Sequence, residues 1–250
     1  MKDINAKLSV MLKTLHLPGM RKSFDDIIIR ARKESLSHSE FLLELLEREL
    51  EARRVNRTER LLRESSLPLH KNMDAFDLKR LPQSLSTHIR TILKGDFIKN
   101  KENILAFGKP GSGKTHLLCA IAQKQILNGY RLYFSPCSLL VQELLRAKTE
   151  LRLAKLLKKY SRFDAIIIDD IGYVQQSREE MEVLFTLIAD CYEKTSVMLT
   201  SNLPFSKWER IFKDPMTTAA AIDRLVHHSI ILEINAPSYR MEKAKEKKTA

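Results

Sequence analysis

Residues 108–115 form a motif that can bind the phosphates of a nucleotide. They fit G-x-x-x-x-G-K-[ST], in which glycines let the backbone turn its N–H groups toward phosphate oxygens. A lysine at the seventh position would carry its charge to the β- and γ-phosphates, and the hydroxyl that follows would bind Mg²⁺. A strand is expected before the motif and a helix after it, which favours phosphate binding over an ordinary glycine-rich turn. The predicted nucleotide-binding residues are Gly108, Lys109, Pro110, Gly111, Ser112, Gly113, Lys114 and Thr115.

A buried apolar strand is predicted at 164–169, and its apolar run ends in two adjacent carboxylates. Charges at the end of such a strand are costly unless a cation accompanies them. We therefore predict that Asp169 binds Mg²⁺ through water and that Asp170 orients or deprotonates the attacking water. A turn or a helix cap would also explain two aspartates, but the phosphate motif upstream favours the functional interpretation.

A polar residue, Asn202, follows the next predicted strand, at 196–201. Ligands of open α/β sheets lie outside the carboxyl ends of the strands, so Asn202 and Asp169 are expected at the same edge as the phosphate motif. There the amide would hold the attacking water and sense the γ-phosphate. The alternative is that Asn202 only caps the turn before Pro204.

The helix predicted at 216–227 contains Arg224 and ends beside His227 and His228. An arginine on a helix is usually a solvated surface residue. In an oligomeric ATPase it can instead enter the neighbouring subunit's site as an arginine finger and stabilise charge in the transition state. The two histidines are too close together to bind one metal from a single helix face, and we interpret them as structural.

The order of the predicted elements indicates the fold class. Five short apolar strands alternate with helices, which predicts an α/β fold with a parallel sheet covered by helices on both faces. The first seventy residues instead show helical spacing, with three helices of which the last ends near Arg63. We predict a helical N-terminal domain at 1–70 for partner binding or self-association, an ATPase domain at 71–240, and a basic flexible tail at 241–250. The strands are predicted at 103–107, 130–135, 164–169, 196–201 and 229–234.

The composition narrows the class of protein. The 250 residues carry a net charge of +12, which favours a polyanionic partner such as nucleic acid. Half of that charge falls between residues 146 and 162, where seven basic residues accompany a single acidic one, Glu150. Such a run is either a solvated helix face or a surface that neutralises DNA phosphates. The predicted DNA-binding residues are Arg146, Lys148, Arg152, Lys155, Lys158, Lys159 and Arg162.

Cysteine usage and hydropathy indicate the compartment. The three cysteines have no spacing typical of a disulfide framework or a zinc knuckle, so we expect them to be buried in a reducing environment. The charged N-terminus does not match a signal peptide, and no window of 18 apolar residues predicts a membrane span. We expect a soluble cytoplasmic protein.

The motifs in their order resemble the IstB/DnaC family of AAA+ ATPases over about residues 75–240. The segments that carry the resemblance are GKPGSGKT, IIIDDIG, TSNLPF, AAAIDRLVHHS and SYR. Three of them, IDDIG, TSNLPF and DRLVHHS, look closest to IstB, the helper encoded beside the transposase in bacterial insertion sequences. The N-terminal MLKTLHLPGMRKSF is also similar to IstB.

The resemblance implies a five-stranded sheet in the order 5-1-4-3-2, with ATP and Mg²⁺ as cofactors. It further implies a homo-oligomer that assembles with ATP on double-stranded DNA, without sequence preference, and delivers that DNA to a transposase in the bacterial cytoplasm. By family position, Arg224 resembles the arginine finger that acts in trans. Arg240, in the segment SYR, resembles a second arginine that senses nucleotide, although the family's helical lid domain is missing or very short here.

Three other functions are compatible with parts of the sequence. A replicative helicase loader of the same family would share the ATPase motifs and differ in partner. A small-molecule P-loop kinase would share the phosphate motif but would not account for Asn202, Arg224 or the basic run. A scaffold would bind ATP and DNA without useful hydrolysis, which an ATPase assay with and without DNA would distinguish.

Overall fold

Two units of different architecture make up the chain. The computed structural model describes residues 2–172, 177–239 and 241–242, and the units are Met1–Arg60 and Leu61–Ala250. The division lies before the boundary predicted at residue 70, because Leu61 and Leu67 are buried in the hydrophobic core of the second unit.

The described part of the first unit is helical, as predicted. Its helices are α1 (Lys2–Thr14), α2 (Pro18–Glu34) and α3 (His38–Glu64), of which α3 runs on into the second unit. Phe24 and Ile27 of α2 pack with Leu45 of α3 in a small core. The carboxylate of Glu49 in α3 accepts hydrogen bonds from the backbone N–H of Gly19 (2.7 Å), at the start of α2. Burial works to raise the pKa of Glu49, but hydrogen bonds from Arg53 and this helix start lower it overall.

The second unit is built on a parallel sheet. Within the described residues its five strands are β1 (Asn103–Phe107), β2 (Leu132–Pro136), β3 (Ala165–Ile171), β4 (Ser196–Ser201) and β5 (Ser229–Glu233). Their order across the sheet is β2-β3-β4-β1-β5, and every neighbouring pair is parallel. This confirms the predicted α/β class and the strand order that the family resemblance implied.

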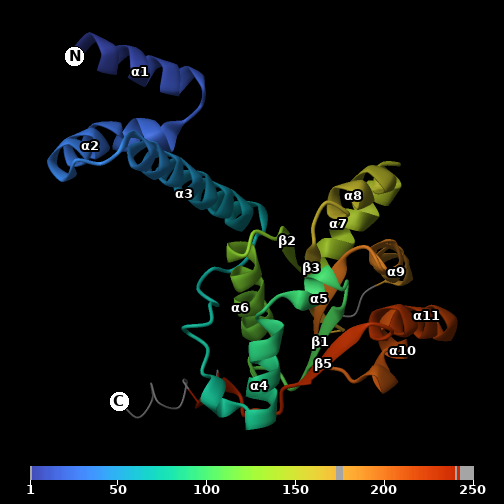
Figure 1. Ribbon diagram of the computed structural model, residues 1–250. Helices are drawn as coiled ribbons and strands as arrows, with labels where there is room; N and C mark the ends of the chain where they lie inside the picture. Colours follow the sequence, from blue (N-terminus) through green and yellow to red (C-terminus); the bar gives the residue numbers. More distant parts are fainter. Residues whose placement is uncertain (1, 173–176, 240, 243–250) are drawn as a thin grey trace. The chain divides into compact units, whose positions relative to one another are not determined.

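Helices cover both faces of the sheet (Figure 1), and the strands supply both layers of the core. Ile166 and Ile168 of β3 are buried with the helices on one face, whereas Ile167 is buried with those on the other. This alternation follows from the two-residue period of a strand. The first face carries α7 (Cys137–Thr149), α9 (Arg178–Cys191), α10 (Glu209–Phe212) and α11 (Pro215–Val226); the other carries α4 (Gln83–Ile92), α5 (Asp96–Lys99) and α6 (Lys114–Leu127).

Residues 137–160 form two helices, α7 and α8 (Leu153–Tyr160). Leu151 lies between them in the left-handed conformation, with φ at 56°. The N–H of Arg152 donates to the carbonyl of Ala147 (2.7 Å), a hydrogen bond that closes the end of α7. The basic run therefore lies on a helical hairpin and not on one continuous helix.

The structure describes the surroundings of the three cysteines and the character of the helices. Cys119, Cys137 and Cys191 are all buried and unbridged. In the part of the chain that the structure describes, none of the helices has the length and apolar character needed to cross a membrane.

Candidate functional site

The phosphate motif forms the turn between β1 and α6. Gly111 (φ 81°) and Gly113 (φ 100°) adopt left-handed conformations that favour glycine, and α6 begins directly afterwards at Lys114. A Cβ atom on Gly111 would lie 2.1 Å from Oγ of Ser238, so the loop also lacks room for a side chain there. The turn thus places a helix N-terminus and several backbone N–H groups at the carboxyl edge of the sheet.

The side chain of Lys114 is folded into this loop. Its Nζ donates to the carbonyl oxygens of Gly108 (2.8 Å) and Lys109 (3.0 Å), and the residue is only 5% exposed. Backbone carbonyls bear only partial negative charge, so a phosphate oxygen would be a stronger partner for this ammonium group. The loop therefore holds a cation ready for an anionic ligand.

A hydrogen-bonded network connects this loop with the end of β3. Oδ1 of the buried Asp169 accepts hydrogen bonds from Oγ1 of Thr115 (2.7 Å) and from Oγ1 of Thr200 (2.7 Å). Thr200, in β4, also accepts a hydrogen bond from the N–H of Asp170 (2.7 Å). A hydroxyl and a carboxylate oxygen are the hard donors that Mg²⁺ takes, so Thr115 and Asp169 fit the predicted magnesium site.

The β3–β4 ladder is irregular between Ile168 and Ile171, and this irregularity changes the directions of the Asp169 and Asp170 side chains. Asp170 has a left-handed backbone (φ 59°), and its side chain is exposed at the edge of the sheet. Such a bulge re-aims a side chain that would otherwise alternate to the opposite face. Both carboxylates consequently lie at the phosphate edge, one buried and one facing solvent.

Thr200 was not identified from the sequence, although a hydroxyl at the end of an otherwise apolar strand was visible. We expect Thr200→Val to lower the free energy of unfolding by about 1–3 kcal/mol, because Asp169 and the N–H of Asp170 both lose a buried partner. Hydrolysis should slow as well, because the position of Asp170 depends on this contact. Thermal unfolding and steady-state ATPase rates would measure the two effects.

The matched control is Ser196→Ala at the other end of β4, where Oγ makes one long hydrogen bond to the carbonyl of Phe97 (3.4 Å). This variant should leave the ATPase rate unchanged. A Thr200→Val protein with the wild-type rate would show that Thr200 does not position Asp170.

Two buried polar atoms beside the loop have no hydrogen-bond partner among the described residues: Oγ of Ser112 and Oδ1 of Asn202. Unpartnered buried polar atoms are rare in native proteins and often mark a site that a ligand or water completes. Asn202 also lies at the edge of the sheet predicted for it, with Asp170 beside the same cavity. It is therefore placed to hold a water or a phosphate oxygen.

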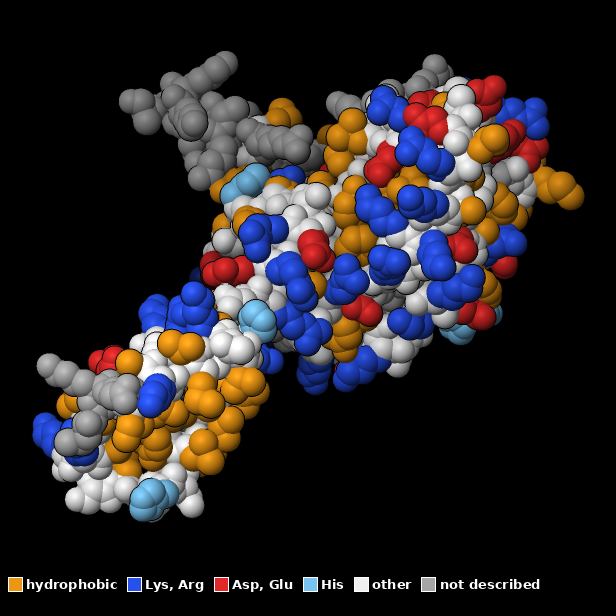
Figure 2. Space-filling model, turned by 90° about the horizontal axis from the view of Figure 1, so that it is seen from above, with side chains coloured by type: hydrophobic (Ala, Val, Ile, Leu, Met, Phe, Trp, Pro, Cys, Tyr) orange, Lys and Arg blue, Asp and Glu red, His pale blue; other side chains and the backbone are white. Residues whose placement is uncertain are grey.

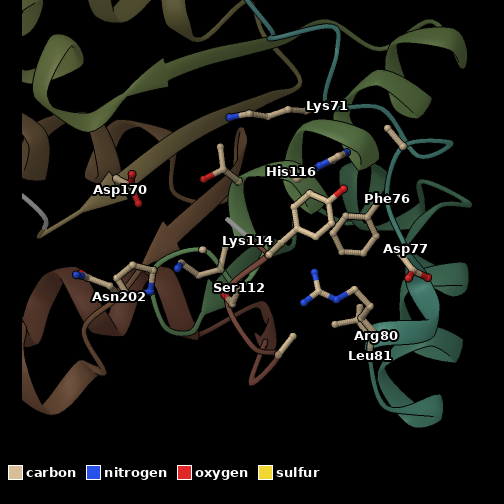
Figure 3. A pocket seen from close by; sticks show the side chains of 17 residues that line it. Lys71, Phe76, Asp77, Arg80, Leu81, Ser112, Lys114, His116, Asp170 and Asn202 are labelled. Atoms are coloured by element: carbon tan, nitrogen blue, oxygen red, sulfur yellow. The ribbon is translucent and has the colours of Figure 1, made fainter. Parts of the chain in front are cut away.

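These residues line a cavity of about 320 Å³. Figure 3 shows Lys114, Asp170 and Asn202 at one end and the ring of Phe76 at the other. The phosphate motif forms the wall between the two ends. The other lining residues are Lys71, Ala75, Asp77, Arg80, Leu81, Pro110, Gly111, Ser112, Gly113, Thr115, His116, Ala236 and Tyr239.

The aromatic end of the cavity was not found by sequence reasoning. The guanidinium of Arg80 lies 5.0 Å from the ring centre of Tyr239 and donates to the carbonyl of Pro237 (3.1 Å). The N–H of Tyr239 donates to the carbonyl of Gly111 (3.1 Å), so the segment after β5 closes over the loop. Flat aromatic walls with nearby polar groups suit a planar heterocycle. Arg240, predicted to sense nucleotide, lies outside the described residues.

Arg224 is not among the residues that line this cavity. It lies in α11, where Nη1 donates to the carbonyl of Ala220 (2.9 Å) and the guanidinium packs 5.2 Å from the ring centre of Phe185 in α9. The residue is half-buried. Arg224 is therefore separate from the cavity of its own chain.

The basic hairpin of α7 and α8 presents all seven of its predicted cations to solvent. Figure 2 shows Lys and Arg side chains gathered on the face of the second unit that contains these helices. Lys148 pairs with Glu182, Arg152 with Glu150, and Lys159 with Glu143. The others, Arg146, Lys155, Lys158 and Arg162, form no ion pair within the described part of the chain.

Comparisons with known proteins agree with this geometry. The family model of IstB-like ATP binding proteins matches residues 10–248. A relative from Sinorhizobium fredii that carries the description of an insertion sequence ATP-binding protein is 41% identical over 97% of this chain and 82% of its own length. The IS5376 ATP-binding protein of Geobacillus stearothermophilus is 39% identical over 91% of this chain and 90% of its own length.

Solved structures resemble much of this chain in fold. DnaA from Aquifex aeolicus, bound to AMPPCP, has a TM-score of 0.55 and 19% identity over 74% of this chain and 56% of its own. The DnaC helicase loader has a TM-score of 0.51 and 22% identity over 66% of this chain and 97% of its own. At these identities the likeness shows a shared fold.

Proposed function

This chain belongs to the family of IstB-like ATP-binding proteins, and from that membership we propose that it is the helper ATPase of an insertion sequence. In this proposal it assembles with ATP on double-stranded DNA and delivers that DNA to the partner transposase. The observation that carries the proposal is a preformed phosphate loop, with Lys114 buried in it, beside the Thr115–Asp169 pair.

The cavity fits ATP in one orientation. The triphosphate would lie at the end formed by Lys114 and the N-terminus of α6, because that end carries the cation and the helix dipole. The adenine would lie toward Phe76, Leu81 and Tyr239, where the walls are aromatic and apolar. Thr115 and Asp169 would hold Mg²⁺, which when bound neutralises the charge of the β- and γ-phosphates.

The chain's own groups would then act on water. Asp170, exposed at the cavity, would accept the proton of the attacking water or fix its orientation. The buried Oδ1 of Asn202 has no hydrogen-bond partner among the described residues, so it can accept a hydrogen bond from that water. Arg224 would stabilise the developing charge from the neighbouring subunit, because it lies away from its own cavity.

DNA binding is assigned to the basic hairpin of α7 and α8. Its cations are exposed, clustered and only partly paired, which suits contacts to phosphates without base reading. Lys155 and Lys158 are suited to a test because neither makes an ion pair among the described residues.

We expect DNA binding that is independent of sequence and falls steeply with salt. Reversing the charge at Lys155 and Lys158 together should weaken binding at low salt and reduce the slope of log K against log[salt] by about 2, since each lost phosphate contact removes about 0.9. Fluorescence anisotropy with duplexes of unrelated sequence, at several salt concentrations, would measure both.

The control reverses two exposed lysines on the opposite face of the sheet, Lys94 and Lys124, which gives the same net charge. That protein should keep the wild-type slope. If both double variants lose affinity equally, the effect is one of net charge, and the hairpin is only a solvated face.

The N-terminal unit is proposed to contact protein partners. It exposes several apolar side chains, among them Leu42, Leu43, Leu46 and Leu50 on α3. Exposed apolar patches of this kind typically mark interaction sites. Capture of a transposase would support the transposition role, whereas capture of a hexameric helicase would instead identify a helicase loader.

A further inference from the structure

Two surface turns far from the nucleotide cavity bring together a carboxylate and two imidazoles. Glu193 follows α9, and His227 and His228 follow α11. One ligand atom from each of the three side chains lies within 4.8 Å of the others, and all three residues are exposed. Glu193 could not be identified as a partner of the histidines from the sequence, because it lies in a different turn.

The two histidines do not share one helix face, which corrects the expectation drawn from their spacing. α11 ends at Val226, so His227 caps the helix and His228 already belongs to the turn before β5. Their side chains can therefore diverge from the helix and converge on a point outside it. The third group, Glu193, approaches that point from the α9–β4 turn.

The backbone that carries these side chains is fixed by hydrogen bonds. The N–H of His227 donates to the carbonyl of Asp223 (3.0 Å), and the carbonyl of His228 accepts from the N–H of Asn103 (2.7 Å) at the start of β1. On the other side, the N–H of Lys194 donates to the carbonyl of Cys191 (2.9 Å). The cluster therefore combines an ordered backbone with side chains that are free to adjust.

A tyrosine supports the first histidine. Oη of Tyr192 lies 3.0 Å from Nδ1 of His227. A hydrogen bond at one ring nitrogen orients the imidazole and leaves Nε2 as the free ligand atom, an arrangement common in metal sites.

We propose that Glu193, His227 and His228 bind a divalent transition-metal ion of the zinc type, with water completing the coordination. Imidazole nitrogen and carboxylate oxygen are ligands that zinc prefers. Ligand atoms around a tetrahedral zinc ion lie about 3.4 Å apart, so side chains whose ligand atoms lie within 4.8 Å of one another need to close in by about 1.4 Å at most. Rotation of exposed side chains provides that movement.

No cysteine competes for this ion. Cys191 lies two residues before Glu193, but it is buried and is not one of the three clustered groups. The thiol is therefore inaccessible to an ion bound at the surface. The charged groups near the cluster are of both signs. Lys194 pairs with Asp190 (3.7 Å). Asp223 and Arg224 lie close to Tyr192.

A bound ion would join the α9–β4 turn to the end of α11. The same two helices carry Phe185 and Arg224, which pack on each other. The metal site would thus stabilise the helix pair that positions Arg224, and this consequence does not depend on the proposed role in transposition.

The test uses the full chain, with zinc chloride as the probe, in the absence of nucleotide. Isothermal titration calorimetry should show one site, and excess zinc should raise the thermal unfolding midpoint. His227→Ala and His228→Ala should each weaken binding at least tenfold, and Glu193→Gln several-fold, with the rise in the midpoint lost in parallel. Co²⁺ should give visible d–d absorption that both histidine variants lack.

The matched control is His88→Ala, which removes an exposed histidine outside the cluster and should bind zinc as the wild type does. Circular dichroism would establish that each variant is folded. Zinc affinity that is unchanged in His228→Ala, or the absence of binding by the wild type at 100 times the protein concentration, would overturn the proposal.

Discussion

Replacing Lys114 with alanine is expected to weaken ATP binding by about 10²-fold or more and to abolish ATP-dependent assembly. A charge-assisted hydrogen bond contributes about 1.5–3 kcal/mol, and this lysine would make several to the β- and γ-phosphates. The side chain is already held within the loop by two carbonyls, so no rearrangement is needed before phosphate binds. Titration with a fluorescent ATP analogue and analytical ultracentrifugation with and without ATP would measure the losses.

The control is Lys124→Ala, which removes an exposed lysine from the same helix, α6, and should bind ATP normally. Thermal unfolding would separate a binding defect from a folding defect, because Lys114 also bonds to its own loop. Normal ATP affinity in a folded Lys114→Ala protein would mean that the cavity does not hold the triphosphate at this end.

The second large effect is expected at Arg224. Arginine fingers contribute roughly 10³–10⁵ in rate in related phosphoryl-transfer chemistry. Because Arg224 lies away from its own subunit's cavity, Arg224→Ala should bind ATP normally but hydrolyse it slowly. Activity per subunit of the wild type should rise with protein concentration and with DNA that gathers subunits. Steady-state hydrolysis over a range of protein concentrations would measure both trends.

Mixing variants tests whether this arginine acts between subunits. Asp170→Asn should bind ATP and assemble but hydrolyse slowly, because Asp169 and Thr115 remain to hold the metal. An equal mixture of Arg224→Ala and Asp170→Asn subunits should regain activity, up to about a quarter of the sites, where an intact Asp170 meets an intact Arg224 across a head-to-tail interface.

Arg210→Ala, in the short helix before α11, is the matched control and should hydrolyse ATP at the wild-type rate. If the mixture shows no recovery and a demonstrated monomer hydrolyses ATP at full rate, Arg224 has no role in trans. Unchanged hydrolysis by Asp170→Asn alone would instead remove Asp170 from the proposed mechanism.

The phosphate end of the cavity could be predicted from the sequence because its parts are local or follow from strand order. Gly111, Gly113 and Lys114 lie within one short turn, whose backbone conformation depends on the glycines themselves. Asp169 lies near the end of the apolar strand β3, and Asn202 directly follows the apolar strand β4. Parallel strands bring their carboxyl ends to one edge of the sheet. Asp169 and Asn202 therefore come together once the strands pair in parallel.

The opposite end of the cavity depended on contacts between distant parts of the chain. Phe76 lies in no motif, and Tyr239 lies in the segment SYR, where only Arg240 was given a role. Both meet the phosphate loop only because the segments before β1 and after β5 close over it. The β3–β4 irregularity that separates Asp169 from Asp170 arises where Thr200 replaces a ladder partner for the N–H of Asp170. Neither feature is visible as a periodic pattern in the local sequence.

The sequence by itself determined the family, the α/β fold and the groups that would contact phosphate, since each is recorded in short motifs and in the period of apolar residues. Only the tertiary structure decided the second half of the cavity, the hairpin break at Leu151, the packing of Arg224 on Phe185, and the meeting of Glu193 with two histidines. These features depend on which side chains of different helices and strands fit together. Such packing is decided by complementary shapes in three dimensions, and it produces no periodic pattern in the sequence.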